Sequence, residues 1–268
     1  MLRLNNLKLP LDHDDSALQG AILAGLGIAI EELIGYTIAR RSYDARKRGA
    51  ISLIYTLDVE TTREADLRQR LHAGDPALDG TIAPTPDTTY RFVAKSVPSQ
   101  SLRPLVIGMG PSGLFAGLVL AQMGLRPILL ERGKNVRERT VDTFGLWRKK
   151  ILNPESNVQF GEGGAGTFSD GKLYSQISDK RHYGRKVLTE FVKAGAPEEI
   201  LYVSKPHIGT FRLVSMVENM RADIQALGGE IRFSHRVDDV LVETDASGTR
   251  HLRGVTLANG EQLRADHV

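Results

Sequence analysis

Runs of β-forming residues fill the N-terminal part of the chain. Apolar and polar side chains alternate over residues 2–9, with a slip at Asn5–Asn6, and this alternation predicts a first strand. Further β-rich stretches predict strands at residues 33–42, 50–59 and 89–93.

Two helices are expected between these strands. Ser16 can cap a helix that ends near Gly25–Gly27. Thr61 or Thr62 can cap a second helix over residues 63–71. The resulting β-α-β-β-α-β order is typical of a small ferredoxin-like α+β domain.

The pattern changes after a stretch that is rich in serine and proline. Residues 95–104 have the composition of a linker. A short apolar strand, a glycine turn and a long helix follow it. We therefore expect two domains, residues 1–98 and residues 99–268, and the overall class is α/β.

The glycine turn has the sequence GMGPSG at residues 108–113. It lies between an apolar strand at 105–107 and a helical pattern over 114–123. A second apolar strand, residues 127–130, ends at Glu131. This is the strand–turn–helix–strand order of a dinucleotide-binding Rossmann unit. A glycine turn without a ligand is the alternative, and the complete context argues against it.

Each position of the motif has a physical task. Gly108 permits the tight turn, Gly110 leaves room for a pyrophosphate, and Gly113 lets the helix pack close to the sheet. The helix N-terminus offers free N–H groups to the phosphates. Glu131 stands where an acid accepts hydrogen bonds from a ribose hydroxyl.

A second GxGxxG match lies at residues 161–166. No buried-strand pattern precedes it, and residues 167–171 are too polar and glycine-rich to begin a helix. We therefore expect neither a second Rossmann unit nor a dedicated NAD(P) domain. Further along, the pattern predicts a helix at 211–227, strands at 230–234 and 237–243, and a hairpin of 252–257 with 262–268 about Asn259–Gly260.

From Arg103 onward the chain resembles the glutathione-reductase-like class of FAD proteins, whose fingerprint continues through Gly117, Gly124 and the tripeptide 131–133. More narrowly, it resembles a family of bacterial FAD-dependent oxidoreductases (dehydrogenases). The segments that carry this closer resemblance are RSYDARK at 41–47, QFGEGGAGTFSDGKL at 159–173 and KPHIGT at 205–210.

The resemblance implies a flavoprotein with a non-covalent FAD and hydride or electron transfer at the flavin. It places residues 159–173 near the flavin and Val237 against the adenine. Glycine-rich backbone with an interspersed cation can also lie against an electron-rich ring edge, although a surface glycine loop is the alternative. The expected FAD-binding residues are Gly108, Gly110, Pro111, Ser112, Gly113, Glu131, Arg132, Gly163, Gly164, Thr167, Ser169, Lys172 and Val237.

The amino-acid composition excludes several kinds of redox centre. The chain has no cysteine, which excludes disulfides, iron–sulfur clusters and a catalytic thiol. A flavin would therefore exchange electrons directly with a small-molecule substrate or a donor such as NAD(P)H. No secretory signal pattern is present, and a cytoplasmic, membrane-free protein is expected. Asp12-His13-Asp14-Asp15 could offer metal ligands, but its charge suits a helix N-terminus, and no metal is expected.

A non-catalytic binding module is the alternative to an enzyme. It would be either a flavin-free remnant or a nucleic-acid-binding protein that uses the basic turn at residues 40–48. No aromatic stacking motif accompanies that turn, so nucleic acid is the less favoured partner.

The end of the chain departs from the family pattern. Relatives continue beyond the strand that ends here at Val268, into a substrate region and a flavin-contacting segment. We expect a fragment that binds FAD weakly and that self-associates through an exposed apolar patch.

Overall fold

The computed structural model describes residues 1–47, 49–94, 102–175 and 177–268. The chain divides into two compact units. Unit 1 comprises Met1–Thr89, Leu173–Arg185 and Glu198–Pro206, and unit 2 comprises Tyr90–Lys172, Lys186–Pro197 and His207–Val268. The boundary predicted between residues 98 and 99, and most of the predicted linker, lie outside the described residues.

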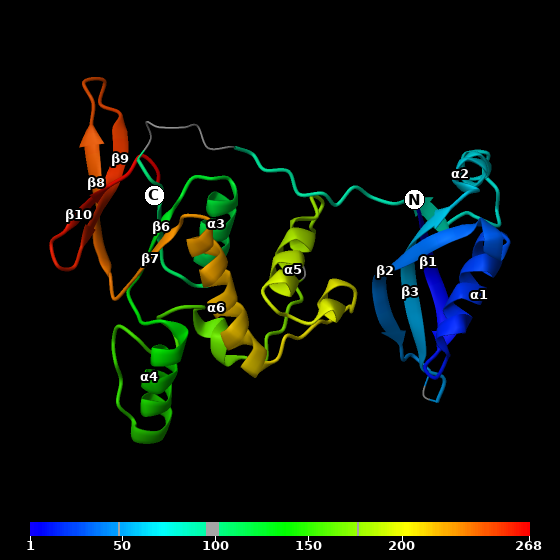
Figure 1. Ribbon diagram of the computed structural model, residues 1–268, viewed down its shortest axis with the longest axis horizontal. Coiled ribbons are helices and arrows are strands. Elements are labelled where there is room, and N and C mark those ends of the chain that lie inside the picture. The colour runs from blue at the N-terminus through cyan, green and yellow to red at the C-terminus, as the bar shows by residue number, and fades with distance from the viewer. Residues whose placement is uncertain (48, 95–101, 176) are drawn as a thin grey trace. The chain divides into compact units, whose positions relative to one another are not determined.

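Unit 1 is built on a four-stranded antiparallel sheet of order β2-β3-β1-β4. Its core consists of one face of this sheet and the apolar sides of both α-helices, with Leu2, Ile22, Leu57 and Leu67 almost fully buried. The elements are β1 (Leu2–Pro10), α1 (Asp15–Leu26), η1 (Ile30–Glu32), β2 (Leu33–Asp44), β3 (Ser52–Thr61), α2 (Glu64–His72), β4 (Ile82–Pro84) and η3 (Glu198–Leu201) (Figure 1). The predicted β-α-β-β-α-β order is therefore present.

Two details of that order differ from the sequence prediction. The strand predicted at residues 89–93 is wrong, because the last strand is β4, where Ile82 pairs with Leu4 of β1. Helix α1 is capped by Asp14 rather than Ser16, since the Asp14 carboxylate accepts the N–H of Ala17 at 2.8 Å.

Other local predictions agree with the structure or nearly so. The register of β1 against β3 shifts between Leu4 and Leu7, where a slip at Asn5–Asn6 was expected. Gly27 ends α1 in the left-handed conformation, with φ of +64°. Neither threonine is the N-cap residue of α2, which is Arg63, but Thr61 Oγ1 accepts the N–H of Arg63 at 3.2 Å.

Unit 2 combines a parallel three-stranded sheet of order β5-β6-β7 with an antiparallel three-stranded sheet of order β10-β9-β8. Helices α3 and α6 pack against the parallel sheet and against each other (Figure 1). The elements are β5 (Leu105–Ile107), α3 (Pro111–Gln122), β6 (Ile128–Glu131), α4 (Val136–Lys149), η2 (Ala165–Phe168), α5 (Tyr183–Lys193, which begins within the unit 1 range), α6 (Thr210–Ala226), β7 (Glu230–Phe233), β8 (Val237–Thr244), β9 (Arg250–Leu257) and β10 (Gln262–Arg264).

The core of unit 2 joins its two sheets. Leu105 and Leu130 of the parallel sheet pack with Val255 and Leu257 of β9 and with Ala265. The predicted strands and helices of this region are present, although β10 ends at Arg264 and not at residue 268. Helices α4 and α5 were not predicted. The chain is thus a mixed α/β protein with one parallel and two antiparallel sheets. In the described part of the chain, no helix is long and apolar enough to cross a membrane.

Candidate functional site

The turn between β5 and α3 has the geometry that its glycines predict. Gly108 has φ of +89°, a conformation that side chains other than glycine rarely adopt. Pro111 is the first residue of α3 and follows directly on the N-cap Gly110. A Cβ on Gly113 would lie 1.9 Å from the carbonyl oxygen of Gly108, whereas a Cβ on Gly110 would meet no atom within 4 Å. Gly113 therefore serves close packing, and Gly110 faces open space.

Helix α3 lies unusually close to the sheet. A Cβ on Gly117 would approach the Leu129 side chain to 2.6 Å. Only residues 108–110 separate the end of β5 from the start of α3, so the N-terminus of α3 lies at the end of the parallel strands. Its free N–H groups and the positive end of its dipole suit a phosphate there.

Glu131 at the end of β6 is buried and holds the turn after β5. Its Oε2 accepts the backbone N–H of Met109 at 2.7 Å, and its Oε1 accepts the backbone N–H of Gly133 at 2.8 Å. Only 4% of the residue is exposed. Each carboxylate oxygen has two lone pairs, so both can still accept a ligand hydroxyl.

The second glycine motif packs against the first. The backbone N–H of Gly163 donates to the carbonyl of Met109 at 2.8 Å. A Cβ on Gly164 would lie 3.1 Å from both the Cα of Gly110 and the ring of Pro111. No strand leads directly into this motif in the part of the chain that the structure describes, because the element before it is α4, and the motif opens only the short 3-10 turn η2. The motif therefore forms a wall beside the turn and no second Rossmann unit.

A buried arginine fixes that wall. The guanidinium of Arg139 in α4 donates to the carbonyl oxygens of Asn157, Val158, Glu162 and Gly164 at 2.6–2.8 Å. The side chain is fully buried, and burial lowers its pKa to about 10. It therefore stays a cation at neutral pH and holds the loop from 157 to 164 in one conformation.

Glu162, in the same loop, is a fully buried carboxylate. Its Oε2 accepts the N–H of Val136 at 2.7 Å and pairs with Arg221 at 2.8 Å. Its Oε1 has no hydrogen-bond partner among the described residues. Burial raises the pKa of Glu162 above its usual 4.5, and the bonds from Val136 and Arg221 only partly offset that rise.

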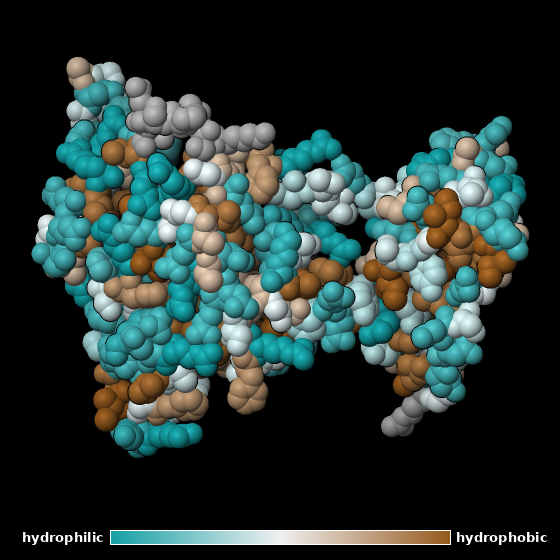
Figure 2. Space-filling view, viewed as in Figure 1, coloured by the Kyte–Doolittle hydropathy of each residue, from teal (hydrophilic) through white to brown (hydrophobic). Residues whose placement is uncertain are grey.

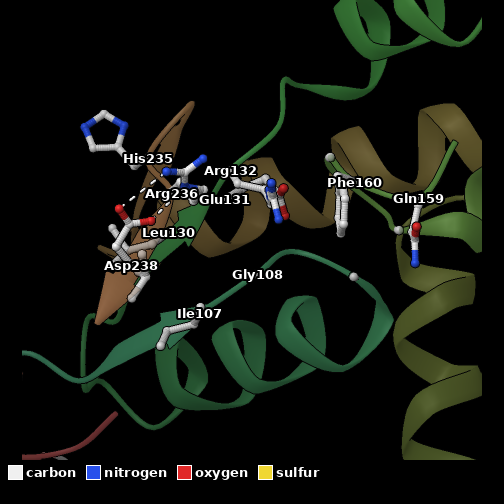
Figure 3. Close-up of a pocket in the computed structure, with 14 residues that line it drawn as sticks. Ile107, Gly108, Leu130, Glu131, Arg132, Gln159, Phe160, His235, Arg236 and Asp238 are labelled. Atoms are coloured by element: carbon white, nitrogen blue, oxygen red, sulfur yellow. Dashed lines mark hydrogen bonds and ion pairs between the residues drawn. The ribbon is translucent and has the colours of Figure 1, made fainter. Parts of the chain in front are cut away.

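These elements enclose a cavity of about 630 Å³ in unit 2 (Figure 3). The β5–α3 turn, the end of β6, the second glycine motif and the start of β8 form its walls. Its lining residues are Ile107, Gly108, Gly110, Leu130, Glu131, Arg132, Gln159, Phe160, Gly161, Gly164, His235, Arg236, Val237 and Asp238.

Fixed charges surround one side of this cavity. Arg132 pairs with Glu155 at 2.9 Å and lies 4.1 Å from the ring centroid of Phe160. Arg236 pairs with the other oxygen of Glu155 at 2.7 Å and with Asp238 at 2.8 Å. The hydrogen bond from Arg132, followed by that from Arg236, lowers the pKa of Glu155 and keeps it ionised. The two guanidinium groups are thereby held beside the Glu131 end of the cavity.

The structure brings some of the expected FAD-binding residues to this cavity and not others. Those that line it are Gly108, Gly110, Glu131, Arg132, Gly164 and Val237. Those outside its lining are Pro111, Ser112, Gly113, Gly163, Thr167, Ser169 and Lys172. Thr167 is buried, and Lys172 is exposed and lies 3.4 Å from Asp170.

Sequence reasoning did not single out Arg139, Phe160, His235 or Arg236. Phe160 and Gly161 lay inside a recognised segment but were not assigned to the cofactor. His235 and Arg236 directly precede Val237, and their position between β7 and β8 is the signal that could have found them. Arg139 had no such signal, because its short hydrogen bonds all go to backbone carbonyls.

The geometry gives no support to a metal site at residues 12–15 or to a nucleic-acid interface at the basic turn of residues 40–48. Among the described residues, no group of three or more potential ligands could hold a metal, and Asp14 of the acidic run acts as a helix cap. In the basic turn, Arg46 is paired with Asp44 at 2.8 Å, and Arg41 lies 5.3 Å from the ring centroid of Tyr202. Arg48 lies outside the described residues.

Comparisons with known proteins give a partial match and distant likenesses. A family model described as a domain of unknown function (DUF8436) matches residues 1–60. An uncharacterized protein of Clostridium beijerinckii is 40% identical over 239 residues, which are 89% of this chain and 43% of that protein. The chain thus spans less than half the length of this relative.

Among solved structures, Thermovibrio ammonificans THI4 has a TM-score of 0.38 and 19% identity, over 60% of this chain and 52% of that chain. A 3-ketosteroid-Δ4-(5α)-dehydrogenase from Rhodococcus jostii has a TM-score of 0.37 and 13% identity, over 61% of this chain and 44% of that chain. BrvH, a flavin-dependent halogenase from a Brevundimonas species, has a TM-score of 0.26 and 17% identity, over 62% of this chain and 41% of that chain. All three structural resemblances are distant.

Proposed function

We propose that unit 2 is an FAD-type Rossmann domain and that the chain takes part in flavin-dependent redox chemistry, with unit 1 as a ferredoxin-like companion domain. One observation carries the proposal. The N-terminus of α3 opens into the same cavity that Glu131 lines, through Gly110, where an added Cβ would meet no atom within 4 Å. Helix dipole, open space and a buried acid at the next strand end are the features that a dinucleotide needs.

The residues present fit the adenosine diphosphate half of FAD. The pyrophosphate would lie at Gly110 and the N-terminus of α3, and a ribose hydroxyl would donate to Glu131. The adenine would lie beside Val237 and the guanidinium of Arg132, which can stack on an aromatic face. Arg132 and Arg236 are already held by Glu155, so little side-chain ordering is needed on binding.

The flavin half would extend along the wall formed by the second glycine motif. Gly161 and Gly164 line the cavity there, whereas Thr167, Ser169 and Lys172 lie beyond its lining. A bound flavin supplies hydride or electron transfer. The contribution of this chain would be to position the cofactor, with the loop held rigid by Arg139. NAD(P)H or a comparable small molecule would be the electron donor.

Ligand competition tests the proposal. The purified chain, reconstituted with FAD, should show flavin absorbance bands, and ADP should displace the FAD, whereas riboflavin should not. FMN, which lacks the adenosine half, should bind much more weakly than FAD. A chain that stays colourless after reconstitution and that does not bind ADP would contradict the proposal. Oxidation of NADH and NADPH by the FAD-loaded chain then tests the donor.

A further inference from the structure

Helix α4 and the residues after it carry an exposed apolar surface in unit 2. Its members are Val141, Phe144, Trp147, Ile151 and Leu152, exposed by 72, 41, 52, 63 and 60%. Figure 2 shows hydrophobic residues gathered at the lower left, where α4 lies in Figure 1. We call these five residues the α4 apolar surface. Contiguous exposed apolar groups of this kind mark interaction sites.

The arrangement follows from how α4 is attached. Its buried residues are Val136, Arg139 and Thr143, and Arg139 anchors the helix to the glycine loop. Val141, Phe144 and Trp147 follow one another at spacings of three residues, so their side chains are neighbours on the helix surface. Phe144 and Trp147 pack edge to face with ring centroids 5.7 Å apart. Phe168 of η2 packs edge to face against Trp147, with ring centroids 5.8 Å apart, and all five side chains of the surface nevertheless stay at least 41% exposed.

Three consecutive cations adjoin the α4 apolar surface. Arg148, Lys149 and Lys150 are all exposed, and none of them forms an ion pair among the described residues. Arg148 lies over the Phe144 ring at 4.7 Å. The nearest acid along the helix, Asp142, is already paired with Lys134. The surface thus joins exposed apolar and aromatic side chains to uncompensated positive charge.

We propose that the α4 apolar surface and these three cations bind the surface of membranes that contain anionic lipids. Tryptophan and phenylalanine favour the boundary between headgroups and acyl chains, and lysine and arginine are attracted to anionic headgroups. A second copy of the chain is the less favoured occupant, because a two-fold contact through this surface would bring the two sets of cations together. This inference does not depend on FAD binding.

The chain contains its own reporter, since Trp147 is its single tryptophan. The emission of Trp147 should shift to shorter wavelength when the protein is mixed with phosphatidylcholine vesicles that contain phosphatidylglycerol, and the protein should sediment with them. Vesicles of phosphatidylcholine alone should bind far less protein. The wavelength is read rather than the intensity, because a bound flavin changes only the intensity appreciably.

Matched variants locate the binding surface. Substitution of Arg148, Lys149 and Lys150 by Gln should weaken binding to the anionic vesicles about a hundredfold. Substitution of the exposed Lys180, Arg212 and Arg250 by Gln removes the same charge elsewhere and should have little effect. Ile151→Ser with Leu152→Ser should also weaken binding, whereas Phe211→Ser, at a side chain exposed by 94%, should not.

Three results would overturn the proposal: no emission shift on anionic vesicles, an equal loss in the two charge variants, or a shift that appears with rising protein concentration in the absence of lipid. The last would assign the surface to self-association. FAD affinity should be the same in all these variants, so failure of the membrane proposal and failure of the flavin proposal are separate outcomes.

Discussion

The carboxylate of Glu131 accepts the backbone N–H of Met109 at 2.7 Å, so the acid at the end of β6 also fixes the turn that follows β5. A residue expected to contact a ribose therefore has a second task in the protein itself. The two tasks can be separated, because only one of them depends on the ligand hydroxyls.

Glu131→Gln should weaken ADP and FAD binding by about 1.5–3 kcal/mol, roughly ten- to hundredfold, because the charge-assisted hydrogen bond to the ribose is lost. The amide NH2 would also face the N–H of Met109 or Gly133. The measurement is calorimetric titration with ADP and with 2′,3′-dideoxy-ADP. Affinity for ADP should fall much more than affinity for the dideoxy ligand. Equal losses for both ligands would show that Glu131 acts only on the turn.

Substitutions at two glycines of the first motif should have different effects, one on FAD binding and the other on folding. Gly110→Val should abolish FAD binding with little change in thermal stability, because its Cβ meets no protein atom within 4 Å and enters the space for phosphate. Gly113→Ala should destabilise the fold, since its Cβ would lie 1.9 Å from a backbone oxygen. Gly145→Ala, in α4 with nothing within 4 Å, is the control and should be neutral or slightly stabilising. Full FAD occupancy in Gly110→Val would contradict the Rossmann assignment.

The hydrogen bonds from Arg139, and not its charge alone, should stabilise the second glycine motif. Arg139→Met should destabilise the protein by at least about 3 kcal/mol, because each buried carbonyl left without a donor costs about 1–3 kcal/mol. Arg139→Lys keeps the charge but lacks the planar set of donors, and it should recover little of the loss. Urea unfolding measures the stability. FAD titration tests whether the second glycine motif still forms the cavity wall. Arg137→Met, on the same helix but 67% exposed in its side chain, should cost under about 1 kcal/mol. Similar effects at the two positions would refute this role.

The glycine turn was predictable because its determinants are local. The conformation of Gly108 and the start of α3 at Pro111 depend on residues that adjoin in sequence. The strand predicted at residues 89–93 failed for the opposite reason. The short strand β4 exists because Ile82 finds a partner in Leu4, about eighty residues earlier, and propensity does not register such a pairing.

The cavity walls were less predictable than the turn. The short hydrogen bonds of Arg139 go to main-chain oxygens, which every residue possesses, so the sequence does not mark these partners. Helix α4 escaped prediction although Asn135 caps it, because its apolar residues lie on the exposed face and do not form the buried stripe that periodicity detects. Lys172 was expected beside the cofactor from its segment alone, and the fold of that loop places it outside the cavity lining.

Glu162 should make stability fall as pH rises above 4.5. Its folded pKa is raised by burial, so the folded state binds the proton more tightly than the unfolded state does. Its contribution to stability is therefore complete below the unfolded pKa of 4.5 and is lost as pH rises through the raised value. Glutamine does not titrate. The unfolding free energy of the Glu162→Gln variant, minus that of the original chain, should therefore increase as pH rises above 4.5.

A neighbouring acid supplies a control of opposite sign. The hydrogen bond from Arg137 lowers the pKa of Glu218, so that residue contributes stability above pH 4.5 and loses it as pH falls. The same difference for Glu218→Gln should therefore decrease as pH rises. Urea unfolding of the three proteins measures both differences, from below pH 4.5, where Glu218 loses its contribution, up to about pH 8, roughly the upper end of the range of maximal stability. A difference for Glu162→Gln that stays constant with pH would mean that the buried carboxylate of Glu162 is ionised at no cost, with Arg221 compensating it fully.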